Sequence, residues 1–83
     1  MFRIERTVNG SIATLRLAGR VRAENIDELK SELEVSGPMT ALDLEDVSIV
    51  DIEVVRFLRN AERNGTELRR CPPFVREWIY REQ

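Results

Sequence analysis

The chain has 83 residues, of which 42% are hydrophobic and 34% are charged, and its 13 basic and 15 acidic side chains give a formal net charge of −2. A chain of this length holds one small domain, here residues 1–83, and its apolar fraction argues against disorder. Because the two signs of charge nearly balance, the composition gives no reason to expect nucleic-acid binding.

The N-terminal half predicts a β-hairpin followed by a helix. Apolar and polar residues alternate from Phe2 to Val8 and again from Ile12 to Ala18, which is the period of a strand. Asn9-Gly10 between them is the favoured pair of a type I′ turn, because both positions need a positive φ. Residues 23–34 then predict a helix, which Ser36-Gly37-Pro38 ends. The apolar stripe of this helix is formed by Ile26, Leu29 and Leu33.

The C-terminal half predicts two further strand-helix units. Thr40 to Leu44 predicts a buried strand, residues 45–50 an acidic turn, and residues 51–64 a helix that is N-capped by Asp51. Thr66 to Arg70 predicts a short fourth strand, and Pro72-Pro73 is suited to open a last helix. The predicted core includes Leu42, Leu44, Val55, Leu58 and Trp78.

The predicted order is β-β-α-β-α-β-α. Strand-helix-strand units form right-handed parallel crossovers, whereas the hairpin makes the first strand antiparallel to the second. We therefore expect an α/β fold with a small mixed four-stranded sheet and helices packed on it.

The residue inventory argues against catalysis. The chain has no histidine and one cysteine, Cys71, so Ser-His-Asp and Cys-His systems, an internal disulfide and a cysteine-histidine zinc site are all excluded. The glycines are too far apart for a phosphate-binding loop. We expect no enzyme activity, no catalytic residue, no cofactor and no metal. The sequence shows neither a signal peptide nor a run of about 20 apolar residues, so we also expect a cytoplasmic protein without membrane insertion.

Several stretches resemble the STAS domain family. They are Leu42-Asp43-Leu44, Val47-Ser48-Ile49-Val50-Asp51 with the helix after it, Gly19 after the second strand, and Asn64-Gly65-Thr66-Glu67-Leu68. This family includes bacterial anti-sigma factor antagonists and the cytoplasmic domains of sulfate transporters. The resemblance covers the chain from Phe2 to about Ile79. It implies a bacterial, cytoplasmic interaction module in signalling or transcription regulation. The implied partner is a protein, either a relative of an anti-sigma serine kinase or a transporter subunit.

This chain departs from the family at the usual phosphorylation site. In antagonists that switch partners, two small residues, usually serines, and a glycine follow the acidic residue at the position of Asp51, and the second hydroxyl is phosphorylated. Here Ile52 and Glu53 replace the two serines and Val54 replaces the glycine. The resemblance therefore implies that phosphate switching is absent at this position. Glu53 is either a fixed contact with the partner or a surface carboxylate that is favoured by the helix dipole and pairs with Arg56.

We expect the partner to bind the loop and helix start between residues 46 and 56. The candidate contact residues are Asp46, Ser48, Asp51, Glu53 and Arg56. Ser48 is a candidate phosphate acceptor, although a serine in such a place more often makes local hydrogen bonds. The acidic residues at 43, 45, 46 and 51 are more typical of turns and caps than of a Mg²⁺ or Ca²⁺ site.

Two alternatives stay open at this point. One is a small-ligand or nucleotide-binding STAS module, because α/β sheets bind ligands at the carboxyl ends of their strands. The other is a STAS subunit of a transporter complex. Arg69 and Arg70 could belong to a basic patch, but the acidic residues interspersed among the arginines favour a mixed, solvated face.

Overall fold

The structure is a computed structural model and describes residues 1–82. Its elements are β1 (Phe2–Asn9), β2 (Ile12–Val21), the short 3₁₀ helix η1 (Ala23–Asn25), α1 (Ile26–Ser36), β3 (Thr40–Val50), α2 (Ile52–Arg63), β4 (Glu67–Arg69) and α3 (Pro73–Arg81). The predicted order of strands and helices is confirmed. The helices among residues 1–82 are too short or too polar to span a bilayer.

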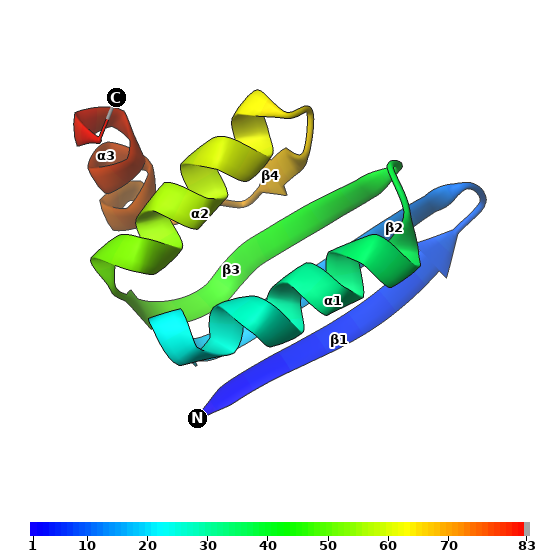
Figure 1. The fold of residues 1–83 in the computed structure, drawn as a ribbon, viewed down its shortest axis with the longest axis horizontal. Coiled ribbons are helices and arrows are strands. Elements are labelled where there is room, and N and C mark those ends of the chain that lie inside the picture. The colour runs from blue at the N-terminus through cyan, green and yellow to red at the C-terminus, as the bar shows by residue number, and fades with distance from the viewer. Residues whose placement is uncertain (83) are drawn as a thin grey trace.

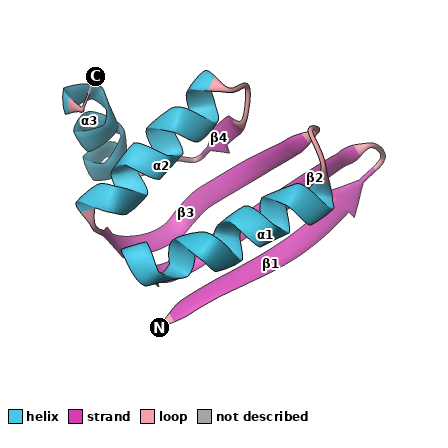
Figure 2. Ribbon diagram, viewed as in Figure 1, coloured by secondary structure: helices cyan, strands magenta, loops and turns pink. Residues whose placement is uncertain are grey.

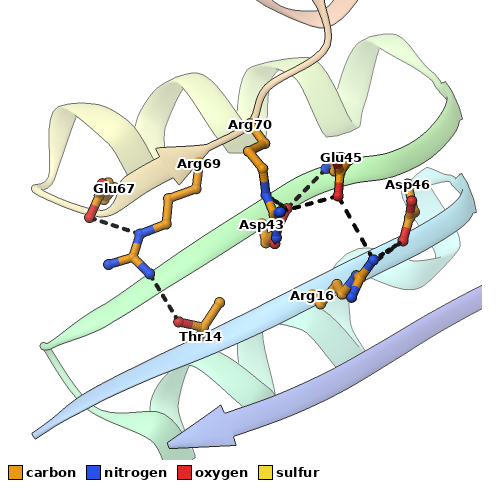
Figure 3. Close-up of polar contacts among 8 residues, drawn as sticks. All are labelled: Thr14, Arg16, Asp43, Glu45, Asp46, Glu67, Arg69 and Arg70. Carbon is orange, nitrogen blue, oxygen red and sulfur yellow. Dashed lines mark hydrogen bonds and ion pairs between the residues drawn. The ribbon is translucent and has the colours of Figure 1, made fainter. Parts of the chain in front are cut away.

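The four strands form one mixed sheet in the order β1-β2-β3-β4. β1 pairs with β2 antiparallel, and β2–β3 and β3–β4 are parallel, as the crossover rule predicts. α1 and α2 lie side by side over one face of the sheet, and α3 packs against α2 (Figures 1 and 2). The opposite face of the sheet, which carries the side chains of Arg16, Asp43 and Arg69 (Figure 3), is called the open face below.

The core lies between the sheet and the helix layer. Alternate residues of β2 and β3 point into it, and α2 contributes a stripe at helical spacing; the fully buried side chains include Leu15, Leu17, Leu42, Leu44, Val54, Val55 and Leu58. Four of the five predicted core residues are thereby confirmed. Trp78 is only partly buried, because the inward stripe of α3 is formed by Val75 and Ile79, four residues apart, and this places Trp78 at the margin.

The main correction concerns β3. Residues 45–50, predicted as an acidic turn, continue the strand to Val50. Two register shifts each insert one extra residue into β3, between the pairs Arg16–Asp43 and Ala18–Asp46 and again before Ile49. Such bulges put neighbouring residues on the same side and break the alternation by which a strand is recognised. Asp46 and Ser48 consequently lie on a strand and not in a loop.

β2 also runs further than predicted, to Val21, with Gly19 inside it. Gly19 has φ +84°, and a Cβ at this position would lie 1.8 Å from the carbonyl oxygen of Met1. The next residue, Arg20, donates its N–H to that same carbonyl at 3.1 Å. A glycine is thus required here, because β1 and β2 approach closely while the backbone adopts a left-handed conformation.

Candidate functional site

The structure divides the predicted contact residues between two surfaces. Glu53 and Arg56 lie on the outer side of α2, with side chains 58% and 52% exposed. Asp46 lies on the open face of the sheet, where it joins a different set of charged residues (Figure 3). Ser48 is exposed on β3. The predicted surface from 46 to 56 is therefore not one continuous loop.

Asp51 is the N-cap of α2, as predicted. Its Oδ1 accepts a hydrogen bond from the N–H of Val54 at 3.2 Å, which satisfies one free donor of the first helical turn. Its Oδ2 accepts from the N–H of Ala23 at 2.8 Å. Both oxygens are thus used within the chain, where they hold the start of α2 against η1.

Arg56 connects the first turn of α2 to the C-terminal end of α3. Its Nη1 lies 3.5 Å from the Glu53 carboxylate, and its Nε donates to Glu82 at 3.1 Å. Arg59, one turn further along α2, donates to the backbone carbonyl of Glu82. The pairing of Glu53 with Arg56 that we considered from the sequence is present, and it lies on a helix that α3 braces.

A groove between α1 and α2 lies beside this pair and has a volume of ≈ 490 Å³. Its apolar lining comes from half-buried side chains of both helices, namely Ile26, Leu33, Phe57 and Ala61. Charged and polar residues border it, namely Lys30, Glu53, Arg56 and Asn60. Glu53 and Arg56 therefore stand beside an apolar surface that the sequence did not lead us to expect.

The open face carries a second cluster of charged residues, which is centred on Asp43. This side chain is buried in the middle of β3, with a residue exposure of 3%. Its carboxylate accepts from both Nε and Nη2 of Arg70 and from the N–H of Glu45 (Figure 3). Burial alone would raise the pKa of Asp43, but the hydrogen bonds from Arg70 and Glu45 and the charge of Arg70 outweigh it and lower the pKa.

Arg16 and Arg69 extend this cluster across the sheet. Arg16 donates to Asp46 through Nε and Nη2 at 3.0 and 2.7 Å. Arg69 pairs with Glu67 at 3.2 Å and donates to the Thr14 hydroxyl at 3.3 Å. These arginines and Arg70 line a hollow of ≈ 320 Å³ on the open face. Every arginine of the cluster already has a carboxylate partner, so the hollow is not strongly basic.

The register of the four strands explains why charged residues of opposite sign lie side by side in this cluster. Glu5 on β1 is opposite Arg16 on β2, Arg16 is opposite Asp43 on β3, and Asp43 is opposite Arg69 on β4. The sign of charge therefore alternates across all four strands in one row. The sequence contained a signal for it that we did not use: Asp43 lies between two core leucines, and a charged residue in such a strand needs a partner.

The acidic residues at 43, 45, 46 and 51 are spread over two elements of the fold. Asp43 lies within β3 and Asp51 caps α2. Among residues 1–82, no group of three or more His, Cys, Asp or Glu side chains is arranged to hold a metal ion. The cap role expected for one of these residues is confirmed, whereas the turn role expected for Asp43 is wrong, because this residue pairs across the open face.

No family model and no curated protein matches the chain. Among solved structures, it is similar to the crystal structure of an uncharacterized protein of the DUF3478 family, described as having a SpoIIAA-like fold, from Shewanella loihica PV-4. The TM-score is 0.53 with 12% identity, and the match covers 81% of this chain and 61% of that one. The chain thus spans less than two thirds of that protein's length. At this identity the likeness shows the fold alone: the chain has a SpoIIAA-like fold, which is the fold of STAS domains.

Proposed function

We propose that this domain is a non-enzymatic protein-interaction module that binds its partner at the groove between α1 and α2. The observation that carries the proposal is the position of Glu53 and Arg56 beside the apolar lining of that groove. An apolar centre with a charged border is the usual anatomy of a protein interface. The ion pairs of Arg56 and the contacts of α2 with α3 hold this surface in place before binding, which lowers the entropic cost of association.

The resemblance to anti-sigma factor antagonists, together with the SpoIIAA-like fold, favours one kind of partner. It is a relative of the serine kinases that act as anti-sigma factors, in a bacterial cytoplasm. A transporter subunit is the second kind that the family resemblance implies. The two kinds differ in what a binding assay has to supply, because a kinase relative can be purified as a soluble chain.

The proposed module is not switched by phosphate at the usual place. Residues 51–55 contain no hydroxyl side chain, and the Glu53 carboxylate, with about −1 charge, stands where a phosphate of −1.5 to −2 would otherwise act. After incubation with such a kinase and ATP, mass spectrometry should find no phosphate within residues 51–55. A phosphate on the exposed Ser48 would instead move the switch to β3.

The chemistry of the titratable groups supports a non-enzymatic role. Burial raises the pKa of the Cys71 thiol, so this group is a poor nucleophile near neutral pH. The hydrogen bond from Arg76 lowers the pKa of Glu62, and Asp43 is lowered as well, so both remain carboxylates and neither is tuned as a general acid. The absence of histidine removes the commonest general base.

The test is a titration with a kinase relative that the domain captures from its native cell. We expect the double variant Glu53→Lys, Arg56→Glu to bind at least about tenfold more weakly, because it reverses both border charges. Its Tm should fall by no more than about 4–8 °C: the pairing of residues 53 and 56 is kept with reversed signs, and loss of the Arg56–Glu82 pair at the surface costs about 1 kcal/mol at most. Glu34→Lys, an exposed reversal near the end of α1, is the matched control and should bind normally. Equal affinity of the double variant and the parent would refute the proposal.

One observation favours the alternative of a small-ligand or nucleotide-binding module. The open-face hollow combines three arginines with the side chains of Thr7, Asn9 and Thr14, which could donate to a phosphate group. An anion would have to displace carboxylates from those arginines, so we rank this function second. Melting with GTP or ATP decides: a ligand at 100 times its Kd adds about 2.7 kcal/mol to the free energy of unfolding.

A further inference from the structure

The outer edge of β1 has no strand beside it within residues 1–82. The hydrogen bond from Arg20 N–H to the Met1 carbonyl sets the phase of the β1–β2 ladder. Odd-numbered residues of β1 therefore direct their backbone groups toward β2. Even-numbered residues direct theirs outward; these are Phe2, Ile4, Arg6 and Val8. Such an edge is a template for another strand.

The side chains on the open face of this edge carry opposite charges. Glu5 is the outermost member of the alternating row that runs through Arg16, Asp43 and Arg69. Within residues 1–82, neither Glu5 nor its neighbour on the same face, Arg3, forms an ion pair. The row thus ends at the edge of the sheet in an exposed carboxylate without a partner.

We propose that the edge pairs with the β1 edge of a second copy of this chain, antiparallel, with Ile4 opposite Ile4 of the second copy. In this register Arg3 of each copy stands opposite Glu5 of the other. These are non-hydrogen-bonded pairs, in which side chains come closest. Arg3 of the second copy then adds the next positive charge to the row that ends in Glu5.

The other antiparallel registers of this strand are poorer. A two-fold axis at Arg3, Glu5 or Arg6 puts a charged residue opposite its own copy, and like charges directly opposite each other are destabilising. An axis at Thr7 leaves both Arg3 and Glu5 without an opposite charge. Only the register at Ile4 places Arg3 of each copy opposite Glu5 of the other. It also brings the half-buried Ile4 of each copy together on the side of the sheet that faces the helices.

The two-fold axis stands perpendicular to the sheet at Ile4, so both helix layers lie on the same side of one continuous eight-stranded sheet. The open faces join as well. Edge pairing alone buries less than the roughly 1,200 Å² of a stable interface, so the dimer is weak, with a Kd of about 10 µM or higher.

Sedimentation equilibrium up to about 1 mM protein at low salt, where charge pairs are least screened, tests the dimer. Arg3→Glu and Glu5→Arg each put like charges opposite in the homodimer and should raise the Kd about tenfold or more. The double variant Arg3→Glu, Glu5→Arg restores complementary pairs and should return the Kd to within about threefold of the parent. An equimolar mixture of the two single variants should dimerise again, as a heterodimer.

Two results would overturn the proposal: a parent chain that stays monomeric at about 1 mM, or a double variant as weak as the single ones. Cross-linking tests the register in a Cys71→Ser background. Ile4→Cys should form a disulfide, because opposite Cα atoms of a hydrogen-bonded pair are about 5.5 Å apart. Arg6→Cys is the control and should not, because the two copies of residue 6 are separated by four residues, about 13 Å. The reverse pattern would refute the Ile4 register.

Discussion

The carboxylate of Asp43, in the middle of β3, is held by the guanidinium of Arg70, which follows β4. Arg70 has φ +50°, a left-handed conformation that is uncommon for residues other than glycine. Its side chain nevertheless reaches back over the sheet, where its Nη1 also pairs with Glu45 at 3.3 Å. The pair thus ties the connection between β4 and α3 to the centre of the sheet.

Removal of Arg70 should therefore cost more than removal of an ordinary surface arginine. We expect Arg70→Ala to lower the free energy of unfolding by about 1–3 kcal/mol, since it leaves the buried Asp43 carboxylate without its charged donor. Arg81→Ala, which breaks an exposed pair with Glu77, should cost no more than about 0.5–1 kcal/mol. Urea unfolding of both variants is the measurement. Equal losses would mean that the Asp43 pair behaves like any surface ion pair.

The same pair should contribute to acid sensitivity. The pKa of Asp43 is lowered in the folded chain from its ordinary 3.8, so its stabilising contribution is complete above that value and is lost as the pH falls below it. The Glu62 carboxylate, lowered by Arg76, acts in the same direction. The free energy of unfolding should fall more steeply with acid in the parent than in Asp43→Asn. Identical slopes below about pH 4 would contradict the assignment.

The close approach of β1 and β2 at Gly19 makes this glycine irreplaceable. Gly19→Ala should destabilise the domain strongly, because the new Cβ meets the Met1 carbonyl 1.8 Å away and something must shift. Gly10→Ala is the matched control. It has φ +65° with no atom within 4 Å, so it should cost only the left-handed conformation, about 1–2 kcal/mol. Thermal melts in which Gly10→Ala is the worse variant would argue against this geometry.

Packing of α2 on the sheet should depend on Leu58, which is 1% exposed. Leu58→Ala should lower the free energy of unfolding by about 2–5 kcal/mol, which is a large share of the stability of a domain this small. Val35→Ala on α1, where the side chain is 70% exposed, should change it by no more than about 0.5 kcal/mol. A loss below about 0.5 kcal/mol for Leu58→Ala would mean that α2 presents another side to the core.

Local patterns in the sequence were sufficient for most of the fold. Gly10 and the alternation of Ile12 to Ala18 identify the hairpin, and Asp51 marks the start of α2. The predicted Asn9-Gly10 turn is one residue out of place: Asn9 stays in β1 opposite Ile12, so Gly10 and Ser11 form the turn, and of Asn9 and Gly10 only Gly10 has a positive φ, +65°. The end of β3 was not predictable in the same way. Its two bulges place Glu45 and Asp46, and then Ser48 and Ile49, in adjacent exposed positions, so the strand resembles a polar turn.

The candidate sites depend on contacts that no local pattern contains. Arg70 reaches Asp43 across 27 positions of sequence, and Arg16 reaches Asp46 across 30. The groove beside Glu53 and Arg56 needs α1 and α2 to lie side by side, which follows from the sheet order and not from either helix. What the sequence did indicate was the exposed first turn of α2, because its charges fall outside the apolar stripe.

Amide chemical-shift mapping of the ¹⁵N-labelled domain with its kinase-type partner tests the central proposal most directly. We predict that the perturbed amides cluster along residues 26–33 and 53–60, on both sides of the groove between α1 and α2. Residues 3–7, on the edge strand β1, should be unperturbed and serve as the internal control. Perturbations confined to that strand, with α1 and α2 unaffected, would contradict the proposal.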